Sequence, residues 1–187
     1  LLLIHYPKSF GLLVTLPYWT YTLSFGRHEI RDGRHWPAFS KSFILFRAMR
    51  RHLGIHIHPL PSALKKAEEQ PNAQFVFAMF PHAVLSDYHV AMDGLWQSIF
   101  PNIYQNIRTL TASVLFRVPV IRELGLWTSG IDASRKIAEK ALDRGRTILV
   151  RPGGEAEQLR TNQGREIVYL KNRKGFIRLA MRNKVPV

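Results

Sequence analysis

The sequence predicts an α/β fold preceded by an apolar N-terminal segment, and two patterns support this. From about residue 55 onward, short apolar runs alternate with stretches whose apolar residues recur every three or four positions. Strands produce the first pattern and amphipathic helices the second, so their alternation is typical of a sheet covered by helices. Before residue 27, a long uncharged stretch indicates a different environment.

The uncharged stretch covers residues 9–26, which are 18 residues long. At about 1.5 Å per residue it nearly crosses a hydrocarbon core, but Pro17 and several hydroxyl residues interrupt it. We therefore predict that residues 1–26 form a membrane-embedded or re-entrant segment, with Tyr18, Trp19 and Tyr21 at the level of the lipid headgroups. A buried core helix broken by Pro17 is the alternative. A signal peptide is disfavoured because no basic start or small-residue cleavage site is evident.

The first helix of the following domain is predicted at residues 38–53, where apolar residues recur at helical spacing. Arg47, Arg50 and Arg51 lie near its C-terminal end, where the helix dipole favours positive charge.

Strands are predicted at residues 75–80, 108–111, 147–150 and 167–170, and a fifth begins at 185–187. Helices are predicted between them at about residues 61–70, 85–99, 132–143 and 174–183. Asp132 or Ser134 is the expected cap of the third helix, and Gly145 marks its end.

Charge and composition narrow the function classes. The 187 residues include 27 Lys and Arg against 13 Asp and Glu, giving a formal net charge of +14. This charge predicts an anionic partner: nucleic acid, an anionic membrane, or a polyphosphorylated substrate such as coenzyme A. The absence of cysteine excludes disulfides and a cysteine nucleophile from these residues. The length fits one domain, and we expect a fragment of a longer protein, cut at both ends, because the chain begins with Leu and ends in an apolar run.

A histidine directly follows the first predicted strand. Pro81 and His82 end the apolar run, and ligands of open α/β sheets bind at the carboxyl ends of strands. Near a helix N-terminus the imidazole of His82 stays neutral and able to accept a proton, as a general base requires. Asp87, five residues later, can fold back to orient the ring. Taken alone, the pair favours a capping histidine with an unrelated helix carboxylate, because the His-x4-Asp spacing is common by chance.

A glycine-rich turn follows the strand predicted at 147–150. Gly153 and Gly154 allow the backbone to approach a substrate closely or to form an anion nest, and Glu155 and Glu157 follow. A tight turn capped by Glu155 is the alternative. No Gly-Lys-Ser or Gly-Lys-Thr follows, which excludes a P-loop.

A basic loop opens the last predicted helix. Four cations within eight residues suit coenzyme A phosphates or lipid headgroups, and a solubilising surface is an equal alternative. These cations are Lys171, Arg173, Lys174 and Arg178. Elsewhere, His56 and His58 form at most half a metal site, so we predict no metal.

These motifs, in this order, resemble the diacylglycerol acyltransferase type 2 family, which includes monoacylglycerol and wax-ester acyltransferases and lies within the glycerolipid acyltransferase superfamily. The resemblance covers about residue 33 to the end of the chain. Its matching segments are 36–39, 80–83, 100–102, 119–123, 130–135, 153–157 and 173–176, followed by 185–187.

The resemblance implies a mixed sheet with helices on its faces, with residues 27–187 as a C-terminally truncated catalytic domain. His82 matches the second His of the family's His-Pro-His-Gly motif, although Phe80 and Ala83 depart from it, and Asp87 restores the superfamily's His-x4-Asp spacing. The expected catalytic residues are His82, Asp87 and Glu157. The expected substrate-binding residues are Pro81, Gly153, Gly154, Arg173, Lys174 and Gly175.

The function implied is transfer of a fatty acyl group from acyl-CoA to diacylglycerol, with monoacylglycerol or a fatty alcohol as alternative acceptors. The resemblance further implies no cofactor beyond acyl-CoA as co-substrate, contact with membrane lipid, no nucleic acid, a possible homo-oligomer, and a place at the endoplasmic reticulum membrane or lipid droplet. Two other classes remain open: a serine hydrolase using Ser86 or Ser134 with His82, and a basic nucleic-acid-binding domain.

Overall fold

Four parallel strands form the centre of the structure, a computed structural model that describes residues 9, 11–82, 88–162, 164–165 and 167–187. The strands are β1 (Val76–Ala78), β2 (Ile107–Thr111), β3 (Gly130–Asp132) and β4 (Thr147–Val150), in the order β1-β4-β2-β3. All three pairings are parallel, so the expected mixed sheet is wrong for these strands. Helices return the chain to the same edge of the sheet before the next strand begins, which makes the pairing parallel.

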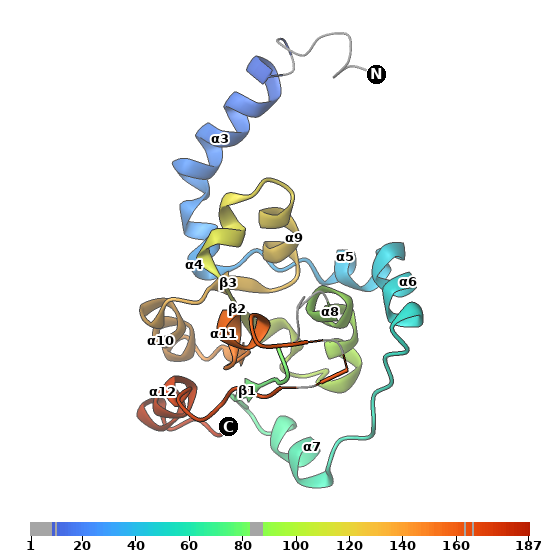
Figure 1. The fold of residues 1–187 in the computed structure, drawn as a ribbon. Helices are drawn as coiled ribbons and strands as arrows, with labels where there is room; N and C mark the ends of the chain where they lie inside the picture. The colour runs from blue at the N-terminus through green and yellow to red at the C-terminus, as the bar shows by residue number, and fades with distance from the viewer. Residues whose placement is uncertain (1–8, 10, 83–87, 163, 166) are drawn as a thin grey trace.

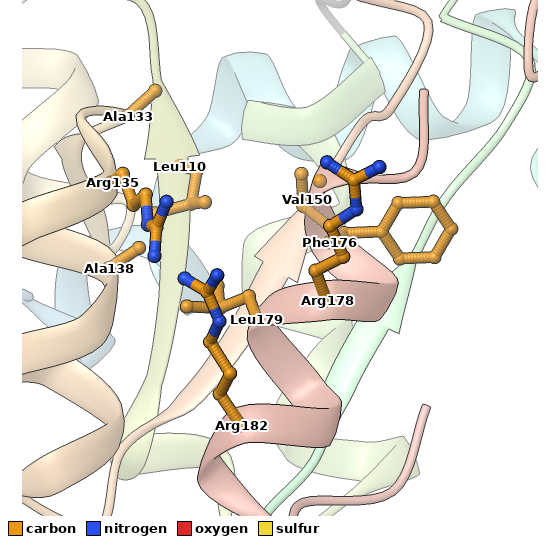
Figure 2. Close-up of a pocket in the computed structure, with 10 residues that line it drawn as sticks. Leu110, Ala133, Arg135, Ala138, Val150, Phe176, Arg178, Leu179 and Arg182 are labelled. Atoms are coloured by element: carbon orange, nitrogen blue, oxygen red, sulfur yellow. The ribbon is translucent and has the colours of Figure 1, made fainter. Parts of the chain in front are cut away.

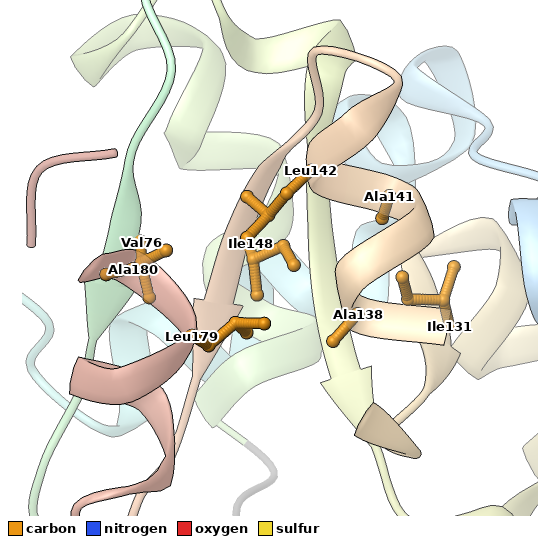
Figure 3. Packing of buried hydrophobic residues seen from close by; sticks show 8 residues of the cluster. All are labelled: Val76, Ile131, Ala138, Ala141, Leu142, Ile148, Leu179 and Ala180. Carbon is orange, nitrogen blue, oxygen red and sulfur yellow. The ribbon is translucent and has the colours of Figure 1, made fainter. Parts of the chain in front are cut away.

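Helices cover both faces of the sheet (Figure 1). One face carries α10 (Arg135–Asp143) and α12 (Gly175–Asn183), and the other carries α7 (Ser62–Glu68) and α8 (Tyr88–Ile99). Alternate residues of a strand point to opposite faces, so Ile148 packs under α10 and α12 while Leu149 packs toward α8. Figure 3 shows the first of these two cores, formed by Val76, Ile131, Ala138, Ala141, Leu142, Ile148, Leu179 and Ala180.

Most of the predicted elements after residue 55 are confirmed. The strands predicted at 75–80, 108–111 and 147–150 are β1, β2 and β4, and the helices predicted at 61–70, 132–143 and 174–183 are α7, α10 and α12. The helix predicted at 85–99 is α8, which is described from Tyr88. The helix α10 ends at a left-handed Gly145, as expected.

Two predicted strands are wrong. Residues 167–170 are irregular, and residues 185–187 form no strand, although the carbonyl of Pro186 accepts a hydrogen bond of 2.9 Å from the Val76 amide. The sequence also gave no sign of β3, because Ile131 is the only large apolar residue among its three. Pairing with β2, rather than its own pattern, makes this segment a strand.

The helix predicted at residues 38–53 is two helices, α5 (Pro37–Ser42) and α6 (Ile44–His52). Phe43 between them has an extended backbone, with φ −63° and ψ 116°. The break lets both helices contact α8, where a Cβ on Gly94 would lie 2.3 Å from the Ser40 carbonyl oxygen. Stacking of the Phe39 and Phe43 rings, with centroids 4.8 Å apart, holds the bend.

The N-terminal segment projects from the domain (Figure 1). It consists of η1 (Gly11–Thr15), a π-helix, and α3 (Leu16–Leu23), which has no buried residue. Within the described residues, no helix combines the length and the hydrophobicity that crossing a membrane requires. The segment also contacts the domain through the hydroxyl of Tyr18, which donates a hydrogen bond of 2.7 Å to the Glu123 carboxylate.

The remaining helical segments are η2 (Phe25–His28), α4 (Glu29–Asp32), η3 (Tyr104–Asn106), η4 (Ser113–Arg117), α9 (Ile121–Trp127) and α11 (Gly154–Gln158).

A buried ion-pair cluster lies where the N-terminal segment meets the domain. Arg122 of α9 donates to Glu29 and to Glu123, each over 2.7 Å, and Tyr21 and Arg34 also donate to Glu29. Burial raises the pKa of Glu29, but its hydrogen bonds with Arg122, Tyr21 and Arg34 outweigh burial and lower the pKa below its usual value.

Candidate functional site

The histidine loop and the glycine-rich turn meet at the carboxyl ends of β1 and β4. The two strands pair in register, with Ala78 opposite Val150, and the Met79 amide donates to the Val150 carbonyl over 2.9 Å. His82 follows β1 by four residues and is half-buried. The sequence therefore predicted correctly that both motifs follow strands, and the strand order makes them neighbours.

Glu157 joins the two loops. Its side chain is fully buried, and its carboxylate accepts a hydrogen bond from the backbone amide of His82. The second carboxylate oxygen accepts a bond of 2.8 Å from the backbone amide of Tyr169. Three segments that are distant in sequence are thus held by one side chain, and the backbone of His82 is fixed relative to the glycine-rich turn.

The structure favours glycine at both positions of the turn, for a different reason at each. A Cβ on Gly153 would lie 2.1 Å from a carboxylate oxygen of Glu157, so only glycine leaves room for that side chain. Gly154 has a φ of +51°, in the left-handed region that favours glycine. The close approach expected at this turn is made, at Gly153, by a carboxylate of the protein itself.

The predicted basic loop divides between two places. The guanidinium groups of Arg160 and Arg173 lie 4.5 Å and 5.5 Å from the centroid of the Tyr169 ring. Arg173 therefore contacts the residue whose backbone amide binds Glu157. Lys174 is exposed at the start of α12, and Gly175 lines a separate cavity.

This cavity, of about 300 Å³, lies between α10 and α12 at the carboxyl ends of β2 and β4 (Figure 2). Arg135 at the start of α10 and Arg178 and Arg182 on α12 line it. Its apolar wall includes Leu110, Ala138, Val150 and Leu179. Sequence reasoning gave Arg182 no role. The spacing of four between Arg178 and Arg182 places them on one helix face, but only the fold brings Arg135 beside them.

Asp87 lies outside the described residues, so its predicted role as the partner of His82 stays a prediction. Pro81 is half-buried and follows Phe80 through a cis peptide bond.

A family model described as diacylglycerol acyltransferase matches residues 12–187. The chain belongs to the diacylglycerol acyltransferase family. The match confirms the resemblance that was based on the ordered motifs, and it extends from the apolar segment through the histidine loop, the glycine-rich turn and the basic loop.

Curated members of the diacylglycerol acyltransferase family match along most of the chain. The chain is 26% identical to diacylglycerol O-acyltransferase 2-like protein 6 of Mus musculus, over 82% of this chain and 45% of that protein. It is 26% identical to diacylglycerol O-acyltransferase 2 of Dictyostelium discoideum, over 97% and 53%. It is 29% identical to acyl-CoA wax alcohol acyltransferase 2 of Homo sapiens, over 94% and 54%. The chain thus spans about half the length of these relatives. No solved structure is significantly similar to it.

A second buried polar group lies on the face of the sheet that carries α8. Asp93 of α8 is fully buried and contacts His35, Ser129 and Tyr104, with distances of 3.2, 3.2 and 3.4 Å between their polar atoms and its carboxylate. Burial, and then the charge of Asp93, raises the pKa of Tyr104 above its usual value. In a catalytic triad the histidine lies between the serine and the carboxylate. Here Ser129 and His35 each contact the Asp93 carboxylate directly, so the arrangement is not that of a catalytic triad.

Among the residues that the structure describes, no group of three or more His, Asp or Glu side chains is placed to hold a metal ion. His56 and His58 are exposed, in the segment that joins α6 to α7.

Proposed function

We propose that the protein is an acyl-CoA-dependent O-acyltransferase that acts on diacylglycerol, with His82 as its general base. Family membership supports the reaction class. The placement of His82 carries the assignment of the base, because its backbone is anchored to the glycine-rich turn at the carboxyl edge of the sheet. A fatty alcohol or monoacylglycerol is the alternative acceptor, and the relative named wax alcohol acyltransferase favours keeping it in the test.

In the proposed reaction, the His82 imidazole takes the proton of the acceptor hydroxyl as the hydroxyl oxygen attacks the thioester carbonyl of acyl-CoA. The carbon–sulfur bond breaks and the carbon–oxygen ester bond remains. The thiolate of coenzyme A then takes the proton from the imidazolium, so that the products are an ester and a thiol and His82 is again neutral. No covalent acyl-enzyme is needed, in keeping with the absence of cysteine.

Two carboxylates have different proposed roles. We assign to Asp87 the orientation of the His82 ring, which rests on the His-x4-Asp spacing. Glu157 is proposed as a positioning residue rather than a group that touches substrate, because it is fully buried and binds two backbone amides. It acts on the reaction through the backbone of His82.

The N-terminal segment is proposed to lie in a membrane, at the endoplasmic reticulum or the lipid droplet surface. Its apolar side chains face solvent in the isolated chain, which is costly unless lipid covers them. The most exposed are Leu12 at 66%, Leu13 at 76%, Leu16 at 59%, Leu23 at 58% and Phe25 at 73%. Arg27 and Arg31 follow and would meet anionic headgroups.

The test uses the full-length protein in microsomes, with labelled oleoyl-CoA and each acceptor in turn. Replacing His82→Ala is expected to lower acyl transfer by about 100- to 10,000-fold, the usual contribution of a positioned base, while the protein still reaches the membrane. His58→Ala is the matched control and should keep wild-type activity, because His58 is exposed in the segment that joins α6 to α7.

Three outcomes contradict the proposal. Substantial transfer by His82→Ala refutes the base. Release of free fatty acid at the same rate with and without acceptor indicates a hydrolase instead. Binding to nucleic acid that weakens steeply with salt, together with no acyl transfer, supports the nucleic-acid alternative.

A further inference from the structure

The cavity between α10 and α12 combines an apolar wall with three arginines at its mouth. Figure 2 shows Arg135 and Arg182 extending toward each other across the gap between the helices, and the guanidinium of Arg178 beside Val150 at the end of β4. The side chains of Arg135 and Arg182 are 66% and 55% exposed. Their charged ends are therefore accessible to a ligand that enters from solvent.

The charge of this cavity is only partly balanced. Glu139 of α10 accepts a hydrogen bond of 2.8 Å from Arg135 and lies 3.8 Å from Arg182. Arg178 has no ion pair with any carboxylate that the structure describes. One carboxylate among three guanidinium groups orders two of them and leaves a net positive mouth, which attracts an anion.

We propose that this cavity binds the phosphate groups of coenzyme A. Guanidinium groups bind phosphate oxygens through paired, charge-assisted hydrogen bonds, which suits a ligand with several phosphates. The N-termini of α10 and α12 also open on the cavity, at Arg135 and Gly175, and helix N-termini add favourable potential for an anion. The apolar wall suits the adenine ring or the arm of the same molecule.

The position of the cavity agrees with this ligand, and here the inference rests on the proposed function. Val150 lines the cavity and pairs with Ala78, and His82 follows Ala78 by four residues. The Cα atoms of Ala78 and His82 are then at most about 14 Å apart, since a chain extends by at most about 3.6 Å per residue. The cavity wall at Val150 is thus one strand spacing and at most four residues of chain away from His82. In this arrangement the phosphates would lie at the arginines, and the pantetheine arm of acyl-CoA would extend toward His82 with the thioester at its end.

This assignment differs in part from the basic loop predicted from the sequence, because Arg178 of that loop lines the cavity but Arg173 and Lys174 do not. Arg173 lies over the ring of Tyr169 and does not line the cavity, and Lys174 is exposed outside it. The residues that the two sets do not share, Arg173 and Lys174 in the loop and Arg135 and Arg182 in the cavity, therefore make separate predictions that single substitutions can distinguish.

The experiment measures binding by the full-length protein in detergent micelles, without turnover. The ligands are coenzyme A, 3′-dephospho-coenzyme A and pantetheine, which carry progressively fewer phosphates. We expect Arg135→Gln, Arg178→Gln and Arg182→Gln each to raise the Kd for coenzyme A by about tenfold, because a charge-assisted phosphate contact is lost at a partly exposed site. Pantetheine binding should not change.

Two substitutions are controls. Lys140→Gln removes an exposed cation from α10 that does not line the cavity and should leave every Kd unchanged. Arg173→Gln tests the basic loop. Melting temperatures of all variants identify any that fail to fold, and the ligand series on the wild-type protein, which must weaken as phosphates are removed, tests the proposal without mutation.

Three results overturn the proposal. They are an unchanged Kd for coenzyme A in all three arginine variants, a loss confined to Arg173→Gln, and a loss of binding to vesicles of phosphatidic acid while coenzyme A binding is unchanged, which would make this a lipid headgroup site. In activity assays the arginine variants should raise KM for oleoyl-CoA and leave KM for diacylglycerol unchanged. His82→Ala should bind coenzyme A normally. If His82→Ala stays active while the arginine variants lose binding, the proposed base fails and the cavity stands.

Discussion

Replacing Glu157→Gln tests how the histidine loop is held in place. The carboxylate is fully buried and accepts backbone amides from His82 and Tyr169 on separate oxygens. Glutamine has the same shape but one acceptor oxygen, so one buried amide is left facing an NH2 group. An unsatisfied buried donor costs about 1–3 kcal/mol, and changing the remaining bond from charged to neutral costs about 1 kcal/mol more. The free energy of unfolding should therefore fall by about 2–4 kcal/mol.

The effect on catalysis follows from displacement of His82. A shift of about 1 Å in a catalytic group costs on the order of 100-fold in rate, so kcat should fall by about that factor at temperatures where the variant is folded. KM for acyl-CoA should change little, because Glu157 is too deeply buried to touch substrate.

The assay combines chemical denaturation with steady-state kinetics in microsomes. Glu155→Gln is the matched control: it lies two residues earlier in α11 and is exposed, so its unfolding free energy should stay within about 0.5 kcal/mol of wild type. Gly153→Ala should reproduce the Glu157→Gln phenotype, because its Cβ would displace the carboxylate. Wild-type kcat and stability in Glu157→Gln, or equal losses in Glu155→Gln, would refute the reasoning.

Two further predictions concern packing and pH. Gly94→Ala should lower the unfolding free energy by about 1–3 kcal/mol, because the new Cβ would overlap the Ser40 carbonyl where α8 meets α5. Gly125→Ala is the control and should not lower it, because the nearest atom to its Cβ would be 3.6 Å away. Equal melting temperatures for the two variants would contradict this prediction. Glu29→Gln should destabilise the protein by about 2–3 kcal/mol at pH 7 by removing hydrogen bonds with Arg122 and its neighbours. The folded pKa of Glu29 is lowered, so its stabilisation is complete above the ordinary pKa of about 4.3 and is lost as the pH falls through the folded pKa. Melting curves of wild type and variant should converge on acidification, and a difference that stays constant with pH would exclude this cluster as the cause.

The candidate site was predicted from sequence to different extents. The position of His82 after a strand and of Gly153 after another strand followed from apolar runs that end in turn residues. The role of Glu157 as an acceptor for the His82 amide did not follow, because a hydrogen bond between residues 75 positions apart leaves no local pattern. Arg182 was likewise missed, since a basic residue on a helix is normally a solvated one.

The fold shows the same division. Strands β1, β2 and β4 and helices α10 and α12 were determined by the sequence itself, because the period of apolar residues and the turn residues between them are local properties of the chain. The extended backbone at Phe43 depends on packing against α8, and β3 depends on pairing with β2. Only the tertiary structure decided that β4 lies between β1 and β2, and with it that the histidine loop, the glycine-rich turn and the arginine-lined cavity share one edge of the sheet. Strand order is set by which buried faces and backbone groups satisfy one another across long loops, and that competition is not encoded in any single segment.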